Sequence, residues 1–271
     1  MKIIVLKGNH IISEFTHIIH YELSKYYDHV EYKEIYDPRD CNVIHFLISP
    51  QEDILPNRFI LYNLEPMNFR IKKRNDYIEK IKKAEIVWEY SKINLPLIKK
   101  YNDNVIYQPF LYSSYMETLY NINHSIKKDI DVLFYGLMSP RRIKIMRDLK
   151  NNGINVYSPN YPDHNPVWLQ DKFDLISRAK IVINIHYHSE KIDQTNDLLR
   201  IMFLLANKVL VVQEETCDED IDSKLSDIIV PYNKIVTKCK ELLLDNQNLQ
   251  DKCYDLVKTK MCFNLNGSIP E

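Results

Sequence analysis

Short runs of apolar and β-branched residues alternate along the chain with longer segments in which apolar residues recur every three or four positions. The short runs are typical of strands buried in a parallel sheet, and the longer segments are typical of amphipathic helices. In the first half we expect strands over 2–6, 29–35, 42–48, 58–63, 85–91 and 104–109, with helices over 13–27 and 76–84. This alternation predicts an α/β fold with a parallel sheet and right-handed crossovers.

The alternation of predicted strands and helices stops after these elements and resumes further along the chain. Residues 113–130 are polar and carry no convincing apolar period, so we predict a linker with a domain boundary near residue 125. Beyond it we expect strands over 129–136, 154–158, 180–185, 208–213 and 227–232, and helices over 140–153, 169–179, 196–207, 233–245 and 247–262. The sequence therefore predicts two doubly wound, Rossmann-like domains, 1–125 and 126–271, with the last helices free to pack back on the first domain.

Composition narrows the class of protein. The 271 residues are 45% hydrophobic and 27% charged, which is typical of a globular chain. A formal net charge of −1 gives no overall basic field, so we expect no nucleic-acid partner, and we interpret the lysine-rich stretch 70–83 as a solvated helix face. No run approaches the ~20 apolar residues of a membrane span, and the five cysteines form no C-x-x-C pair. We therefore expect a cytoplasmic protein with reduced thiols, in the host cytoplasm if the chain is viral.

In open parallel sheets, ligands bind beyond the carboxyl ends of the strands, and two such sheets that face each other would enclose a cleft. After the first predicted strand come Gly8, Asn9 and His10, which suit either a plain strand–helix turn or a site. This single glycine, without a G-x-G-x-x-G pattern, gives no dinucleotide fingerprint. Glu65 follows another predicted strand and precedes Pro66, so it could act as a general base for a hydroxyl or lie in a solvated turn.

A second junction of strand and helix carries positive charge. The predicted strand 129–136 runs into Gly136, Ser139 can cap the following helix, and Arg141 and Arg142 come at once. Acidic residues usually occupy the first turn of a helix, because the helix dipole is positive there. The two arginines are explained if they bind a phosphate together with the free N–H groups of the helix, or they are ordinary surface residues.

Polar residues crowd the segment "NIHYHSEKIDQTNDLLR" (184–200), which lies between two apolar runs. His186 and His188 could form a metal-binding pair, but no third ligand follows at a firm spacing, so we expect no metal. The helix after them is apolar nearly all round and therefore buried, except for Arg200. An arginine there needs an acidic partner or an anionic ligand. The other residues that we expect in a pocket wall are Tyr187, Asn196, Asp197, Glu214 and Glu215.

Three segments of the second half carry a resemblance to a known family. "DVLFYGLMSPRRIKIMRDLKNNGINV", "DLISRAKIVINIHYH" and "NDLLRIMFLLANKVLVVQEE" resemble, in order and spacing, the donor-binding half of GT-B glycosyltransferases. The short, group-1-like transferases of large DNA viruses and some bacteria are the most similar. "ILYNLEP", "VWEYSKIN" and "VIYQPF" resemble the acceptor-side segments, so the likeness spans roughly residues 2 to 245.

The resemblance implies two Rossmann-like domains that transfer a sugar from a nucleotide-diphosphate-sugar to a hydroxyl of a glycan or glycoconjugate, without a metal or other cofactor. It places the diphosphate at Gly136, Arg142 and Arg200. Asp197 stands where these transferases carry a glutamate that touches ribose or sugar hydroxyls, and its shorter side chain reaches less far. Glu65 or His10 would deprotonate the acceptor if the reaction inverts the sugar.

Two other functions fit the same residues. One is a module that binds a nucleotide-sugar or a glycan without turnover. The other is an epimerase or hydrolase of the same fold that acts on the nucleotide-sugar itself. For these two functions and for the transferase alike, we expect a monomer or a weak homo-oligomer.

Overall fold

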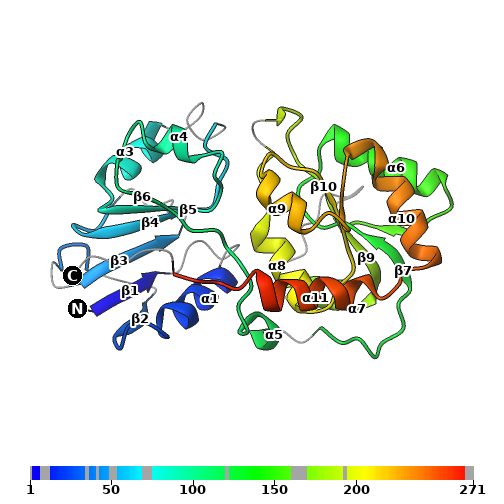
Figure 1. The fold of residues 1–271 in the computed structure, drawn as a ribbon, viewed down its shortest axis with the longest axis horizontal. Coiled ribbons are helices and arrows are strands. Elements are labelled where there is room, and N and C mark those ends of the chain that lie inside the picture. The colour runs from blue at the N-terminus through cyan, green and yellow to red at the C-terminus, as the bar shows by residue number, and fades with distance from the viewer. Residues whose placement is uncertain are drawn as a thin grey trace. The chain divides into compact units, whose positions relative to one another are not determined.

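The computed structural model describes residues 2–6, 13–33, 37–40, 43–48, 54–68, 75–119, 122–159, 170–191 and 194–265. The chain divides into two compact units, which are coloured along the sequence in Figure 1. Unit 1 comprises Met1–Tyr115 together with Phe263–Glu271, and unit 2 comprises Met116–Cys262.

Unit 1 contains a sheet of six parallel strands in the order β2-β1-β3-β4-β5-β6. The strands are β1 (Lys2–Leu6), β2 (Val30–Lys33), β3 (Val43–Ile48), β4 (Phe59–Asn63), β5 (Ile86–Glu89) and β6 (Val105–Tyr107). The described helices are α1 (Ser13–Leu23), α3 (Asn75–Lys83) and α4 (Leu95–Ile98). Every residue of β3, β4 and β5 is buried, because central strands of a parallel sheet are covered on both faces.

The two faces of this sheet have different cores. On one face, the ring of Trp88 packs edge-on against Phe46 and Tyr62, with ring centroids 4.8 and 5.6 Å away. On the other face, aliphatic residues of the strands pack against α3 and α4, through Tyr77 and Ile98 among others. Alternation of side chains along each strand produces this separation.

Unit 2 contains a sheet of five parallel strands in the order β11-β10-β9-β7-β8. The strands are β7 (Ile130–Leu133), β8 (Val156–Tyr157), β9 (Ala179–Asn184), β10 (Val211–Glu214) and β11 (Ile229–Val230). The helices are α5 (Met116–Leu119), α6 (Pro140–Asn151), α7 (Gln170–Arg178), α8 (Leu198–Ala206), α9 (Glu219–Lys224), α10 (Ile235–Leu244) and α11 (Leu249–Lys260), with a 3₁₀ turn over Tyr232–Lys234. The chain leaves β7 toward β8 and returns on the other side as β9, so the strand order reverses between β7 and β9. Ligands of such sheets bind beside the carboxyl ends at this reversal.

Most of the expected strands and helices are confirmed within the described ranges. The short helices α4, α5 and α9 were not predicted, since four to six residues are too few to show an apolar period. None of the described helices is long and apolar enough to cross a bilayer.

The division of the chain differs from the predicted boundary near residue 125, because the compact units separate between Tyr115 and Met116. The final helices α10 and α11 belong to unit 2, where α11 packs along α8 and α10 packs against β10 (Figure 1). The part of the chain that returns to unit 1 is the segment after α11. The Phe263 N–H donates to the Tyr112 carbonyl at 2.7 Å, and the Gln108 amide donates to the Asn264 carbonyl at 2.9 Å.

Trp88→Ala should lower the free energy of unfolding by about 3–5 kcal/mol, because it removes a fully buried ring and leaves a cavity beside Phe46 and Tyr62. The change is measured by urea denaturation, with far-ultraviolet circular dichroism as the probe. Tyr26→Ala, at a position that is 49% exposed, is the control and should shift the value by about 0.5 kcal/mol or less. An unchanged urea midpoint for Trp88→Ala would contradict the packing described for this face.

Candidate functional site

The connection from β7 to α6 brings two positive side chains together. Gly136 follows β7 with a φ of 141°, a conformation that residues with a side chain rarely adopt. A Cβ atom at this position would lie 3.6 Å from Nη2 of Arg200 and 3.8 Å from Nη1 of Arg142. Both guanidinium groups therefore lie beside the same stretch of backbone, at ordinary van der Waals distance from where a Cβ atom would stand.

Arg142 lies in the first turn of α6 and is only 9% exposed. Its Nε donates to the Ile185 carbonyl at 2.8 Å, and its Nη1 donates to the Leu137 carbonyl at 2.6 Å. The guanidinium also lies over the rings of Phe134 and Tyr187, at 5.1 and 5.4 Å. In the part of the chain that the structure describes, no carboxylate forms an ion pair with Arg142. Burial, and next the neighbouring charge of Arg200, lower the pKa of Arg142 to about 9.

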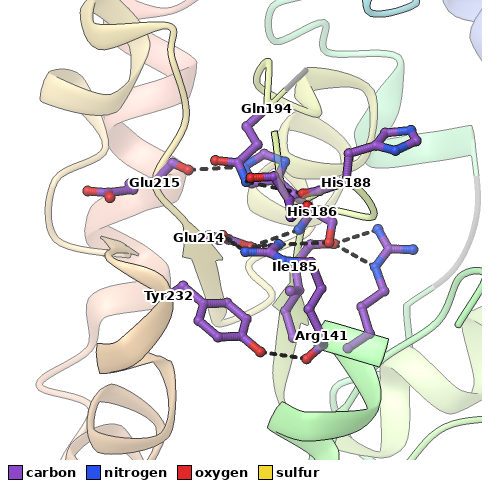
Figure 2. A network of polar contacts seen from close by, with 10 residues as sticks. Arg141, Ile185, His186, His188, Gln194, Glu214, Glu215 and Tyr232 are labelled. Carbon is purple, nitrogen blue, oxygen red and sulfur yellow. Dashed lines mark hydrogen bonds and ion pairs between the residues drawn. The ribbon is translucent and has the colours of Figure 1, made fainter. Parts of the chain in front are cut away.

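Arg141 has a different environment from its neighbour in sequence. Its guanidinium forms a two-pronged ion pair with the Glu214 carboxylate, at 2.7 and 2.5 Å, and also donates to the His186 carbonyl (Figure 2). The ring of Tyr232 lies 4.4 Å from the guanidinium, and the Tyr232 hydroxyl donates to the Arg141 carbonyl. Glu214 also accepts a hydrogen bond from the His186 N–H at 2.9 Å.

These contacts join the start of α6 to the ends of β9 and β10, so they give Arg141 and Glu214 a structural role. The sequence does not predict this ion pair. A part for either residue in ligand binding stays a prediction.

Arg200 lies in the first turn of α8 and has the acidic partner that was one of the two alternatives left open by the sequence. Its Nε lies 3.4 Å from the carboxylate of Asp197, which caps α8, and its Nη1 donates to the Asn184 side chain at 3.0 Å. The guanidinium also lies 4.7 Å from the centre of the Tyr135 ring. Arg200 is thus paired, yet its Nη2 group lies beside Gly136 with Arg142. Two guanidinium groups and one carboxylate meet there, which leaves the site positive.

A buried hydroxyl adds to this cluster. Ser139 precedes α6 and is 6% exposed, but its side chain makes no capping hydrogen bond. Its Oγ has no hydrogen-bond partner among the described residues. A buried hydroxyl without a partner costs free energy, which a hydrogen-bonding ligand at the N-terminus of α6 would recover.

The loop between β9 and α8 is fixed by acidic residues that the sequence does not mark. Asp218 accepts from the Asn196 N–H at 2.8 Å, and Asp222 accepts from the Asn196 side chain at 3.1 Å. The Asn196 Oδ1 atom is buried and has no partner within the described ranges. No motif marks Asp218 or Asp222, because their role depends on how α9 packs beside this loop.

The two histidines of this loop have different contacts. The His186 ring contacts the Glu215 carbonyl at 3.0 Å, and the Gln194 amide donates to the His188 carbonyl (Figure 2). Burial lowers the pKa of the His186 side chain. Among the residues that the structure describes, no group of three or more His, Cys, Asp or Glu side chains is arranged to hold a metal ion.

In unit 1, Glu65 lies half-buried in the turn after β4, and two asparagine side chains donate to its backbone carbonyl. The other candidates of this unit, Gly8, Asn9 and His10, lie outside the described residues.

A cavity of about 330 Å³ lies in unit 2 near the amino ends of β7 and β9, at the opposite edge of the sheet from Gly136. Its lysines are already engaged: Lys180 pairs with Asp131 and Lys208 pairs with Asp251. The third, Lys128, donates to the Ala179 carbonyl just after α7. We therefore assign the cavity no ligand.

The chain is similar in sequence to viral proteins and in fold to solved glycosyltransferases. No family model matches the sequence. The chain is 31% identical over 218 residues to the uncharacterized protein L140 of Acanthamoeba polyphaga mimivirus. The aligned region covers 79% of this chain and 68% of that protein. It is also 31% identical to the uncharacterized proteins R358 and L138 of the same virus, of which it covers 59% and 16%.

Solved glycosyltransferases share the fold. An α-glucosyltransferase in complex with UDP and a 13-mer DNA containing an HMU base has a TM-score of 0.58, with 11% identity and 95% of each chain covered. An α1,3-fucosyltransferase with GDP-fucose has a TM-score of 0.52, with 13% identity and 95% and 82% covered. The predicted GT-B fold of two Rossmann-like domains is confirmed.

The expectation that nucleic acid is excluded as a partner is wrong. Three of the structures with this fold contain DNA, two of them together with UDP and one together with UDP-glucose. The physical reason for the error is that net charge averages over the whole chain. A value near zero does not exclude a local concentration of positive charge that contacts phosphates.

Glu214→Gln should lower the free energy of unfolding by about 3–5 kcal/mol, because it leaves the largely buried Arg141 guanidinium without its counter-charge. Urea denaturation measures this change. Asp129→Asn breaks a similar two-pronged pair with Arg178, but that pair is about half exposed, so the urea midpoint should not move measurably. Equal effects of the two substitutions would show that burial does not distinguish these pairs.

Proposed function

Because this chain belongs to the family of the mimivirus protein L140 and has the GT-B fold of solved glycosyltransferases, we propose that it transfers a sugar from a nucleotide-diphosphate-sugar to a hydroxyl acceptor. The observation that carries the proposal is the convergence of Arg142 and Arg200 beside Gly136. Planar, forked guanidinium groups match the oxygens of a phosphate, and a diphosphate offers room for two of them.

The surroundings of Arg142 suit an anion that binds and later leaves. Its charge is buried and held by neutral carbonyl groups, so a diphosphate would meet a positive group that no carboxylate of the described chain already neutralises. The N–H groups at the start of α6 and the hydroxyl of Ser139 lie beside it. As the bond between the sugar and the diphosphate breaks, negative charge grows on the leaving oxygen, and these groups stabilise it.

The remaining residues of the site provide contacts for the rest of the donor. Asp197 and Asn196 at the start of α8 would bind hydroxyl groups of the ribose or of the sugar. Tyr187, which is 45% exposed, offers a ring next to Arg142.

On the acceptor side, Glu65 would accept the proton of the attacking hydroxyl. The acceptor oxygen then bonds to the anomeric carbon of the sugar, and the nucleotide diphosphate departs with the electron pair of the broken bond. The acceptor is the hydroxyl of a glycan or glycoconjugate. DNA containing an HMU base is the second acceptor to test, since an α-glucosyltransferase with this fold has been solved with it.

Arg142→Met and Arg200→Met should each weaken donor binding about 10–150-fold, because each removes a charge-assisted hydrogen bond to phosphate. Isothermal titration calorimetry with UDP-glucose and with GDP-fucose measures the affinity. Arg147→Met, on an exposed position of the same helix α6, is the matched control and should bind as the wild type does. If both site variants bind the donor as tightly as the wild type, the phosphate assignment is wrong.

Release of the nucleotide diphosphate should require an acceptor and should persist in excess EDTA, because arginines take the place of a divalent cation. A coupled assay for the released nucleotide, run with a glycan panel and with HMU-containing DNA, measures both properties. A β-glucosyltransferase of phage T4 with this fold contains UDP and Mn²⁺, so activity that is lost in EDTA and restored by Mn²⁺ would contradict metal independence. Donor binding without release would indicate a binding module, and conversion without an acceptor would indicate an epimerase or hydrolase.

A further inference from the structure

A cluster of buried polar side chains lies in unit 1 where β4 and β5 end. Asn63 and Glu89 are opposite each other in the register of the two strands, so they project from the same face of the sheet. Both are fully buried, and Ser91 and Asn94 are each 1% exposed. Burying a carboxylate and two amides costs free energy unless every polar atom has a partner, so the partners of this cluster define what it holds in place.

The two amides have the same pair of partners. The Asn63 Nδ2 group donates to the Glu89 carboxylate at 2.6 Å and to the Glu65 carbonyl at 2.9 Å. The Asn94 Nδ2 group donates to the other carboxylate oxygen of Glu89 at 2.8 Å and to the same Glu65 carbonyl at 3.1 Å. One carboxylate therefore orients two amides, and both amides converge on one carbonyl group.

The remaining contacts prevent either amide from turning over. The Tyr77 hydroxyl donates to Oδ1 of Asn63 at 2.7 Å, and the Met67 N–H donates to Oδ1 of Asn94 at 3.0 Å. The Ser91 N–H adds a third hydrogen bond to Glu89, at 2.7 Å.

We propose that Glu89 is a positioning residue for Glu65. Through Asn63 and Asn94 it fixes the backbone of the turn after β4, and this turn carries the carboxylate that takes the acceptor's proton. The inference rests on the proposed transferase function. Positioning matters because a general base displaced by about 1 Å from its reacting proton can lose about 100-fold in rate.

The test compares Glu89→Gln with Glu85→Gln. The first substitution keeps the size of the side chain but replaces a carboxylate oxygen with an NH₂ group, which faces an amide donor. The second lies just before β5 at the other end of the same strand, where Glu85 pairs with Arg58. Hydrogen–deuterium exchange of the peptide that contains residues 63–68 measures the hold on the turn without any need for activity.

We expect faster exchange in this peptide for Glu89→Gln and wild-type exchange for Glu85→Gln. We also expect Glu89→Gln to lower kcat about 100-fold while leaving the donor affinity unchanged, since the donor residues belong to unit 2. Unchanged exchange would overturn the inference. Faster exchange with an unchanged kcat would also overturn it, because the turn would then be loosened without any effect on the reaction rate.

A double variant, Asn63→Asp with Glu89→Gln, separates positioning from simple structural support. It swaps donor and acceptor, so the hydrogen bond between positions 63 and 89 is restored, but the Glu65 carbonyl loses one of its two donors. We expect the melting temperature to recover toward the wild-type value while kcat stays low, and recovery of kcat would contradict positioning. A wild-type chain that transfers no sugar at all would refute the proposed function, whereas the exchange measurement still decides whether Glu89 holds the turn.

Discussion

The guanidinium of Arg142 is a positive charge that is buried and held by the backbone carbonyl groups of Ile185 and Leu137. A buried charge is tolerated only where dipoles or opposite charges replace water, so these carbonyls must stay where they are. They belong to the two loops that follow β7 and β9, the strands between which the order of the sheet reverses. One side chain thus keeps the geometry of both loops, and a ligand that binds there does not have to order them first.

Arg141 and Arg142 are adjacent in sequence but have opposite environments. The first is neutralised by the Glu214 carboxylate and ties α6 to β9 and β10, whereas the second faces Gly136 and Arg200. The helical rotation of about 100° between successive residues separates them. The ion pair of Arg141 with Glu214 fixes helix α6, which also carries Arg142, so the two arginines have different roles in one arrangement.

Much of this fold could be predicted from the sequence, because strands in a parallel sheet are short apolar runs and most helices here are long enough to show their period. The junctions at Gly136, Arg142 and Arg200 were also predictable, since an arginine is unusual both in a first helical turn and in an apolar helix. The Arg141–Glu214 pair was not, because it depends on which strand lies beside α6. Asn63 and Glu89 likewise look ordinary in the sequence, and only the register of β4 and β5 brings them together.

Because residues 263–265 return to unit 1, unit 1 is made of two segments of the chain and unit 2 of one. Unit 2 is one continuous stretch, inserted into the sequence of unit 1, and the hydrogen bond from Phe263 to Tyr112 keeps the points of entry and exit close together. Domain insertions are tolerated at such paired ends. A gene fragment can therefore encode unit 2 in a single piece, whereas unit 1 has to be assembled by joining two separate pieces of the gene.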